Sequence, residues 1–480
     1  MTMKRLTAIF MMILYLIPFS SSAEDKSALF PISENGLWGY MNRAGETVIA
    51  PQWSDATGFR GGYAIACPAP PDSGMDPEDI CGIINTDGEW VIPPDHWEIL
   101  ETDNWGQYIG GRDEGIYIFF STDPHQKEKY AGFFDIPSGF WSGMRYEWVD
   151  GDWIGDVDKE LVCVTLNDLK GFVRRTTGEL VVPCRFDPFL NYYFESGYCS
   201  VLPNDTDVAD GWILIDRTGR EIPMPEGCYL TGHLDSTEDG LIPVWQAFPE
   251  KEHPDEEGLC GYMDLKGNLV IRPQYTWAYS FHEGLACVML DSEREQTAVI
   301  NPENEIVAIL PDPVNRSGSS SDYRNGLLQL AHYTDEHQLA YIAFLNRHGE
   351  EAFRLEAENL FYAGSFFSNG TALYYTGKET PYGTYEDEGC GLFSPEKGIL
   401  TGPIFAVRRD DDTYANFSEG LLLLADAETG KVGFIDDSGR WVIAPEWDSA
   451  EDFRNGLALV EKDDKMIYID HNGFVVWAEP

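Results

Sequence analysis

The sequence is poor in basic residues. It contains 33 Lys and Arg against 81 Asp and Glu, which gives a formal net charge of −48 at pH 7. Binding to DNA or RNA requires a basic surface that neutralises phosphates, and anionic membrane surfaces also select basic patches. Such an acidic chain is therefore expected to bind neither. Hydrophobic residues make up 43% and aromatic residues 13%, so a packed core is expected rather than a disordered chain.

Motifs that carry catalysis or bind metal are also lacking. The sequence has no H-E-x-x-H, no G-x-S-x-G, no Gly-rich phosphate loop and no S-x-x-K accompanied by its partner motifs. It has no C-x-x-C, so a structural zinc site is not expected. We predict that the protein is not an enzyme and has no cofactor, although a glycoside hydrolase needs only two well-placed carboxylates.

Long apolar runs are absent except at the N-terminus. There, Lys4 and Arg5 precede the apolar stretch Leu6–Phe19, and Ser21 and Ala23 follow at positions −3 and −1 of a possible cleavage point. This order is typical of a secretory signal peptide, and the stretch is shorter than the ~20 residues that span a bilayer.

We therefore predict a signal peptide at residues 1–23. The mature chain, residues 24–480, is expected to be secreted or held at the cell surface, with no membrane span. No Cys follows the apolar stretch, so a lipoprotein anchor is not indicated.

Cysteine is sparse, with nine residues in 480, too few for a fold built on disulfides. An exported protein meets oxidising conditions, in which disulfides are permitted. Cys67 and Cys81 flank a Pro-rich loop between two expected strands, so a disulfide between them is plausible. Several of the others are expected to be buried as small apolar residues.

What the sequence does have is a repeat. Trp38–Trp53 (WGYMNRAGETVIAPQW), Cys260–Tyr275 (CGYMDLKGNLVIRPQY) and Val432–Trp447 (VGFIDDSGRWVIAPEW) follow one template. From Gly39 to Gly433 the anchor advances 394 residues in nine steps, about 44 residues per repeat, a period typical of repeat architectures. The template recurs with anchors near residues 39, 82, 132, 171, 213, 261, 298, 343, 391, 433 and 467.

Each repeat has a second half built on F-x-x-G. It occurs at Phe59–Ala64, Phe281–Ala286 and Phe453–Ala458, and more weakly elsewhere. The composite reads G-(Y/F/I)-(M/I/F)-(N/D)-x-x-G-x-x-V-I-x-P-x-(W/Y), then F-x-x-G-L-A-x-V.

These residues resemble the WG-repeat family, whose Trp-Gly dipeptide is intact at Trp38-Gly39. The resemblance extends from Ala28 to the C-terminus, although Cys, Lys or Val often replaces the Trp. It implies a bacterial, frequently exported β-repeat protein, and it implies no enzymatic activity and no catalytic residues.

The template predicts three short strands per repeat. Tyr40–Asn42 and Thr47–Ile49 flank a turn that ends in Gly45, which indicates a β-hairpin. Asn or Asp opens this turn. The Pro after the second strand is expected to end that strand, because Pro cannot donate a hydrogen bond to a β-ladder. A third strand is expected after F-x-x-G, for example at Tyr63–Cys67.

Three short strands cannot bury a face alone, so the repeats must stack into one continuous core. We predict an all-β array of about ten three-stranded antiparallel repeats. The chain starts with a third-strand match at Ala28–Pro31 and ends after a second strand at Phe474–Trp477, which could close a ring or cap two ends. Because propellers typically have ~4–8 four-stranded blades, we favour an open, curved, solenoid-like array over a closed propeller.

Aromatic residues that recur in every repeat are expected in the core, and those that break the pattern are candidates for binding. The first group comprises the residue after Pro and the Phe of F-x-x-G (Trp53, Trp97, Phe186, Tyr275, Trp447; Phe59, Phe194, Phe281, Phe453). The second lies mainly in Trp141–Trp153, which holds three Trp and three acids. Aromatic rings and carboxylates together suit a carbohydrate, and the candidate ligand-binding residues are Trp105, Trp148, Asp150, Asp152 and Trp153.

The acids of this region also allow calcium, which prefers several carboxylate oxygens. The spacing of Asp150, Asp152, Asp156 and Asp158 matches no EF-hand loop, and clusters are expected by chance among 81 acids. Three functions therefore stay open. The first is a non-enzymatic surface for an extracellular glycan or protein, the second is a glycan-active enzyme with carboxylates at 141–158, and the third is a structural envelope spacer. We favour the first because the repeat covers the whole mature chain.

Overall fold

The computed structural model describes most of the chain beyond the N-terminal region. The described residues are 28–68, 80–100, 115–121, 130–150, 160–204, 211–230, 238–247, 258–291, 296–311, 314, 320, 322–334, 339–364, 367–379, 385–406 and 416–480. The predicted signal peptide and the candidate residues Trp105, Asp152 and Trp153 lie outside them.

The described residues form β-strands and no helix, in consecutive units of three antiparallel strands. The leading strands are β1 (Leu29–Glu34), β4 (Tyr63–Pro68), β7 (Ile116–Ser121), β11 (Leu161–Leu166), β14 (Tyr198–Val201), β17 (Leu241–Ala247), β21 (Ala286–Asp291), β24 (Leu328–Tyr333), β28 (Ala372–Glu379), β32 (Leu422–Asp426) and β36 (Leu457–Lys462). The middle strands are β2 (Leu37–Asn42), β5 (Ile80–Asn85), β8 (Ala131–Asp135), β12 (Leu169–Arg174), β15 (Ile213–Asp216), β18 (Gly258–Asp264), β22 (Gln296–Ile300), β25 (Leu339–Leu345), β29 (Tyr385–Ser394), β33 (Val432–Ile435) and β37 (Lys465–Asp470).

Each middle strand then pairs with a trailing strand. These are β3 (Thr47–Ala56), β6 (Trp90–Leu100), β9 (Phe140–Trp141), β13 (Leu180–Phe186), β16 (Glu221–Ile222), β19 (Leu269–Tyr275), β23 (Ile306–Ile309), β26 (Glu351–Leu355), β30 (Gly398–Ile399), β34 (Trp441–Trp447) and β38 (Val475–Ala478). Some units also have a short linking strand before the leading strand: β10 (Trp148–Val149), β20 (Trp277–Ala278), β27 (Leu360–Ala363), β31 (Phe405–Ala406) and β35 (Ser449–Ala450). Every anchor position of the repeat lies in a middle strand, and the predicted all-β array is confirmed.

Two turns recur in the units, as the template predicts. In the hairpin turn, the side chain of Asp264 accepts hydrogen bonds from the backbone N–H groups of Lys266 (2.9 Å) and Asn268 (2.8 Å), and Gly267 has a φ of 89°. The side-chain hydrogen bond from Asn268, with these backbone bonds, lowers the pKa of Asp264 below its ordinary value. In the F-x-x-G turn both central residues have positive φ, as at Asn455 (51°) and Gly456 (87°), which is typical of a tight type I′ turn.

The expectation that Pro ends the trailing strand is wrong. β3 continues through Pro51 to Ala56. Tyr40 of β2 pairs with Ile49 and Trp38 pairs with Trp53. An advance of two residues along β2 therefore corresponds to four residues along β3, and Pro51 lies in the resulting β-bulge. A bulge tolerates Pro because the local ladder is already interrupted there.

The same bulge explains the anchor glycine. The backbone of the trailing strand crosses directly over it, and a Cβ atom on Gly39 would lie 2.6 Å from the nitrogen of Pro51. Gly82, Gly171, Gly261 and Gly433 have the same close approach to their own trailing strands. Only a residue without a side chain fits beneath this crossing.

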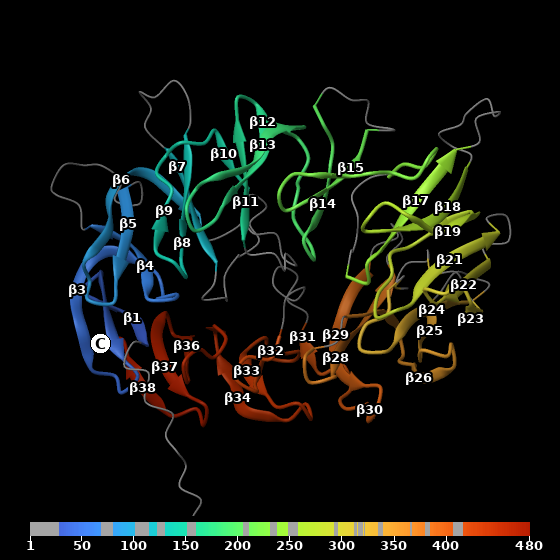
Figure 1. Cartoon of the computed structure of the whole chain (residues 1–480). Helices are drawn as coiled ribbons and strands as arrows, with labels where there is room; N and C mark the ends of the chain where they lie inside the picture. The colour runs from blue at the N-terminus through green and yellow to red at the C-terminus, as the bar shows by residue number, and fades with distance from the viewer. Residues whose placement is uncertain are drawn as a thin grey trace, which may run out of the picture.

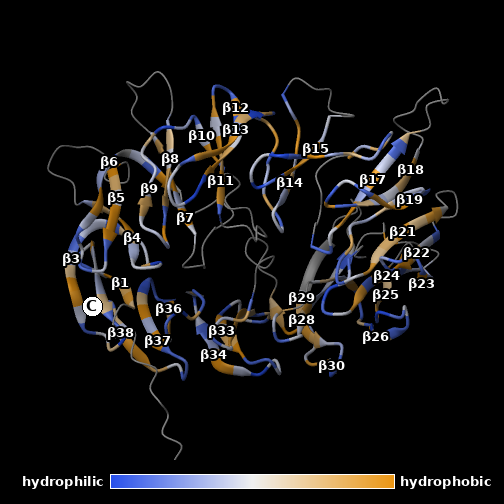
Figure 2. Ribbon diagram, in the orientation of Figure 1, coloured by the Kyte–Doolittle hydropathy of each residue, from blue (hydrophilic) through white to orange (hydrophobic). Residues whose placement is uncertain are grey.

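The recurring aromatic residues belong to the core, as predicted. Trp53, Phe186, Tyr275 and Trp447 are buried, and Trp97 is half-buried. In four units the Phe of the F-x-x-G turn packs on the aromatic residue that follows the anchor glycine. The pairs are Phe59–Tyr40 (4.6 Å between ring centroids), Phe194–Phe172 (4.9 Å), Phe281–Tyr262 (4.8 Å) and Phe453–Phe434 (4.7 Å). Figure 2 shows apolar residues along the strands throughout the array.

The units follow one another along a closed-looking curve, with β36–β38 beside β1 and β3 (Figure 1). The strands form no closed barrel, and within the described residues no strand pair joins the first unit to the last. The array is curved and, as predicted, no strand pairing closes it into a propeller among the described residues, while its two ends touch through side chains. Tyr468 donates a hydrogen bond to the carbonyl oxygen of Pro31 (3.0 Å), and its ring meets Phe30 edge-on. Across the parts of the chain that the structure describes, no helix is long and apolar enough to cross a membrane.

Candidate functional site

Trp148, the first candidate binding residue in the described chain, lies on the short strand β10. Strand β10 pairs with β11, so that Trp148 stands opposite Thr165. The indole ring is half-buried and packs on Phe120 of the preceding unit, with 4.5 Å between ring centroids. Much of this ring is therefore engaged in packing between two units.

Asp150 holds a buried cation. Its carboxylate lies 2.9 Å from the ammonium nitrogen of Lys170, and the two side chains are only 12% and 5% exposed. The same ammonium donates to the carbonyl oxygen of Leu190 (2.9 Å). Lys170 stands directly before the anchor Gly171, where the first repeat has Trp38, so this unit places a charge at a position that is uncharged in the other units. Asp150 compensates that charge.

Glu147 caps a turn of its own unit. Its two carboxylate oxygens accept hydrogen bonds from the backbone N–H groups of Asn167 (2.9 Å) and Asp168 (2.8 Å), both of which have positive φ. The described acids of the Trp-rich region thus have structural partners. Trp148 lies on β10, and Asp150 directly follows this strand. The other candidates, Trp105, Asp152 and Trp153, lie outside the described residues.

The sequence analysis missed two exposed aromatic residues on the linking strands. Trp277 on β20 and Tyr362 on β27 are each 45% exposed. They face Met289 and Tyr375 of their leading strands, the register position that Trp148 occupies opposite Thr165. The sequence could have indicated Trp277, because it stands two positions after Tyr275, the aromatic residue that follows Pro in the template.

These three linking strands therefore present an aromatic side chain at one repeated position. Of the three, Trp277 and Tyr362 are the more accessible for stacking on a ligand.

No metal centre is apparent in the parts of the chain that the structure covers. No three His, Cys, Asp or Glu side chains there gather closely enough to hold an ion. Of the acids considered for calcium, only Asp150 is described, and Lys170 pairs with it.

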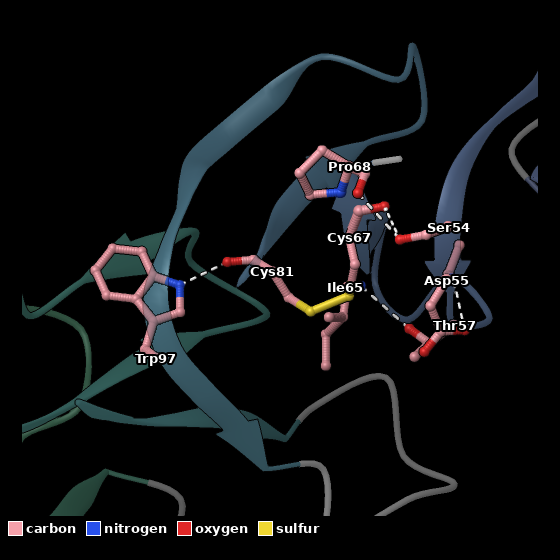
Figure 3. The surroundings of a disulfide bond; sticks show 9 residues. Ser54, Asp55, Thr57, Ile65, Cys67, Pro68, Cys81 and Trp97 are labelled. Atoms are coloured by element: carbon pink, nitrogen blue, oxygen red, sulfur yellow. Dashed lines mark hydrogen bonds between the residues drawn. A yellow bond between two sulfur atoms is a disulfide. The ribbon is translucent and has the colours of Figure 1, made fainter. Parts of the chain in front are cut away.

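Cys67 and Cys81 are joined by a disulfide, as the sequence analysis anticipated (Figure 3). Cys67 lies near the end of β4 and Cys81 near the start of β5, and these strands pair in antiparallel fashion with Ala66 opposite Gly82. Trp97 donates from its indole nitrogen to the carbonyl oxygen of Cys81 (2.6 Å), and Ser54 donates to that of Cys67 (3.1 Å). The disulfide therefore joins the leading and middle strands of one unit.

Removing this disulfide should weaken the N-terminal units. Replacing both Cys67 and Cys81 by Ser is expected to lower the free energy of unfolding by about 2–3 kcal/mol, because the bond closes a short loop in the unfolded chain. Urea denaturation of the variant against the wild type measures the loss. Equal midpoints would contradict the prediction.

The other cysteines are free thiols, and all are buried except Cys184, which is half-buried. Burial raises the pKa of Cys260 to about 12 and that of Cys184 above its ordinary value. Because the thiolate is the reactive form, we expect slow labelling of the native protein by a maleimide, confined to Cys184. Mass spectrometry of labelled peptides would show this, and rapid labelling of Cys260 would contradict it.

The similarities to known proteins outside the repeat are weak. A search of curated proteins found no match. Among solved structures, the computationally designed Ika8 protein shares 11% identity over 66% of this chain and 92% of its own, with a TM-score of 0.34. A eukaryotic initiation factor shares 10% over 78% and 95% (TM-score 0.36), and AztD from Citrobacter koseri 11% over 76% and 91% (TM-score 0.31).

The match to a family model is more specific. The model described as "WG containing repeat" matches residues 38–67, 82–95, 261–293 and 433–465. The matched segments include the anchor glycines Gly39, Gly82, Gly261 and Gly433, which lie beneath the strand crossings described above. At four places, therefore, this chain carries WG containing repeats.

Proposed function

We propose that this protein is an exported, non-enzymatic β-repeat protein that presents an extended surface to a glycan or a protein outside the cell. Arrays of stacked repeats offer long binding faces, since each unit adds an equivalent set of exposed positions. The repeated aromatic position of the linking strands supports this proposal, because it places Trp277 and Tyr362 at one register in different units.

One observation carries the proposal. Glu147 and Asp150, the described acids beside Trp148, are held by backbone N–H groups and by the Lys170 ammonium. A glycosidase requires two carboxylates free to act on the sugar. The described carboxylates that a glycan-active enzyme would most readily use are therefore already engaged in contacts within the protein.

The test is binding of purified mature protein, from Glu24, to a panel of immobilised glycans and envelope proteins, with and without EDTA. We expect saturable capture by one glycan or protein and no turnover of it. Sensitivity to EDTA would add a bound cation such as calcium. Product release, abolished in Glu147→Ala while the fold is kept, would overturn the proposal in favour of an enzyme. Saturable binding to nothing would favour an envelope spacer.

A variant tests the repeated aromatic position. Trp277→Ala is expected to weaken glycan capture at least tenfold, since loss of one stacking ring removes about 1.5 kcal/mol. Trp90→Ala is the control, because Trp90 is also exposed (37%) but lies on the trailing strand β6. Equal loss in both variants would contradict a role for the linking strands.

A further inference from the structure

A basic residue connects consecutive units at one repeated position. The position lies in the hairpin turn between the middle and trailing strands, four residues after the anchor of the repeat. At this position Arg347 donates to the backbone oxygen of Glu283 and lies 3.4 Å from its carboxylate, and Glu283 belongs to the turn of the preceding unit. His471 lies 3.0 Å from the carboxylate of Glu419, again in the preceding unit. We call this contact the clasp.

Two other units have the same contact. Arg175 donates to the carbonyl oxygen of Gly115 (2.6 Å), the residue directly before β7. Arg217 lies 3.8 Å from the carboxylate of Glu160, the residue directly before β11. In both cases the cation again reaches the start of the preceding unit's leading strand.

The turn acids add a second link in the same direction. The carboxylate of Glu283 accepts a hydrogen bond from the backbone N–H of Gly326 (2.8 Å), in the next unit's F-x-x-G turn. Glu419 accepts one from Gly456 in the same way (3.0 Å). Successive turns are thus joined to each other, as well as to the basic residue of the clasp.

The first unit makes the clasp with the last. Arg43 has the clasp position in the β2–β3 turn, and its guanidinium lies so close to Gly456 that a Cβ atom on that glycine would overlap it. Gly456 belongs to the F-x-x-G turn of the last unit. Arg43 of the first unit therefore contacts the F-x-x-G turn of the last unit, just as Arg347 contacts the F-x-x-G turn of the unit before its own.

The tyrosine of the middle strand donates to backbone in several units, to the segment after its own trailing strand in two of them and to the leading strand of the first unit in the last. Tyr40 and Tyr262 each donate to a backbone oxygen beyond their own trailing strand, those of Thr57 (2.8 Å) and Tyr279 (2.7 Å). Tyr468, at the equivalent position of β37, donates to Pro31 of the first unit. Phe30, Ile32 and Met41 share an apolar cluster with Leu457 and Tyr468 across this junction.

We propose that the first and last units meet through the clasp that also joins consecutive units, so that the array is a ring with a single non-covalent seam at which it opens. Every other junction between units has the continuous chain as well as side-chain contacts. In the parts of the chain that the structure describes, no chain connection and no strand pair crosses the seam, and local opening occurs where the fewest contacts must break. The ring-forming residues are Arg43, Phe30 and Pro31 on one side and Gly456 and Tyr468 on the other.

Distances between spin labels test the ring. Glu46, Arg440 and Phe474 are all exposed and are the fourth residue after the Asn or Asp in their hairpin turns. Labels introduced as bio-orthogonal amino acids at 474 and 46 report the seam, and labels at 440 and 474 report a junction between consecutive units. We expect narrow distributions with similar mean distances for both pairs in the full mature chain.

Two variants complete the test. Arg43→Ala with Tyr468→Phe should at least double the width of the 474/46 distribution and leave the 440/474 pair unchanged. Tyr262→Phe, which removes the same kind of hydrogen bond elsewhere, should change neither. A broad or long 474/46 distribution in the unaltered chain would show open ends and overturn the ring. An unchanged seam in the double variant would overturn the role assigned to Arg43 and Tyr468.

Discussion

Asp150→Ala is expected to lower the free energy of unfolding by about 3–5 kcal/mol, because it leaves the Lys170 ammonium buried without a counter-charge. The ammonium side chain is 5% exposed, and its other described acceptor is the carbonyl oxygen of Leu190. Neither water nor a neutral carbonyl replaces the lost carboxylate. Urea denaturation of the two proteins measures the difference.

Replacing both partners separates charge burial from a role in binding. Asp150→Ala with Lys170→Met should recover most of the lost stability, since no buried charge remains. Lys462→Ala is the control for an exposed pair: Lys462 lies 3.0 Å from Glu446 with both side chains 40% or more exposed, and its loss should cost at most about 1 kcal/mol. Normal stability of Asp150→Ala together with lost ligand capture would contradict this account and assign Asp150 to a ligand.

Gly261→Ala should also unfold the protein at much lower denaturant, with a loss of about 3 kcal/mol in the free energy of unfolding. The added methyl group would lie 2.6 Å from the nitrogen of Pro273, where the trailing strand crosses the middle strand. The atoms that obstruct the methyl group belong to the backbone of the trailing strand, so no side-chain rotation relieves the overlap.

Gly58→Ala provides the matched control. Gly58 is exposed, lies in the loop after β3, and has no heavy atom within 4 Å of an added Cβ. Its substitution should change the free energy of unfolding by less than about 1 kcal/mol. Equal effects of the two substitutions in thermal or urea denaturation would show that the strand crossing does not explain the anchor glycine.

The features that could be predicted from the sequence are those that recur in many of the repeats. The hairpin with Asn42 and Gly45, the F-x-x-G turn and the buried aromatic residues depend on neighbours within one unit. A local rule that recurs at a 44-residue period is visible in the sequence because chance does not reproduce it.

The trailing strand shows where local rules fail. Pro51 indicated a strand end, but the bulge opposite Gly39 absorbs it and lets the strand continue to Trp53 and beyond. The Trp-rich region was equally ambiguous, since its composition suits a sugar site and a packed junction alike. Phe120 and Lys170, which engage Trp148 and Asp150, belong to other strands and were not indicated as their partners.

The amino-acid sequence by itself determined the strand pattern, the turns and the recurring core, because each depends on residues close together in the chain. Only the tertiary structure decided that Asp150 compensates Lys170 and that Tyr468 reaches Pro31. The physical reason is curvature. A small rotation at each junction, set by packing that no single repeat contains, accumulates around the array until residues more than four hundred positions apart are in contact.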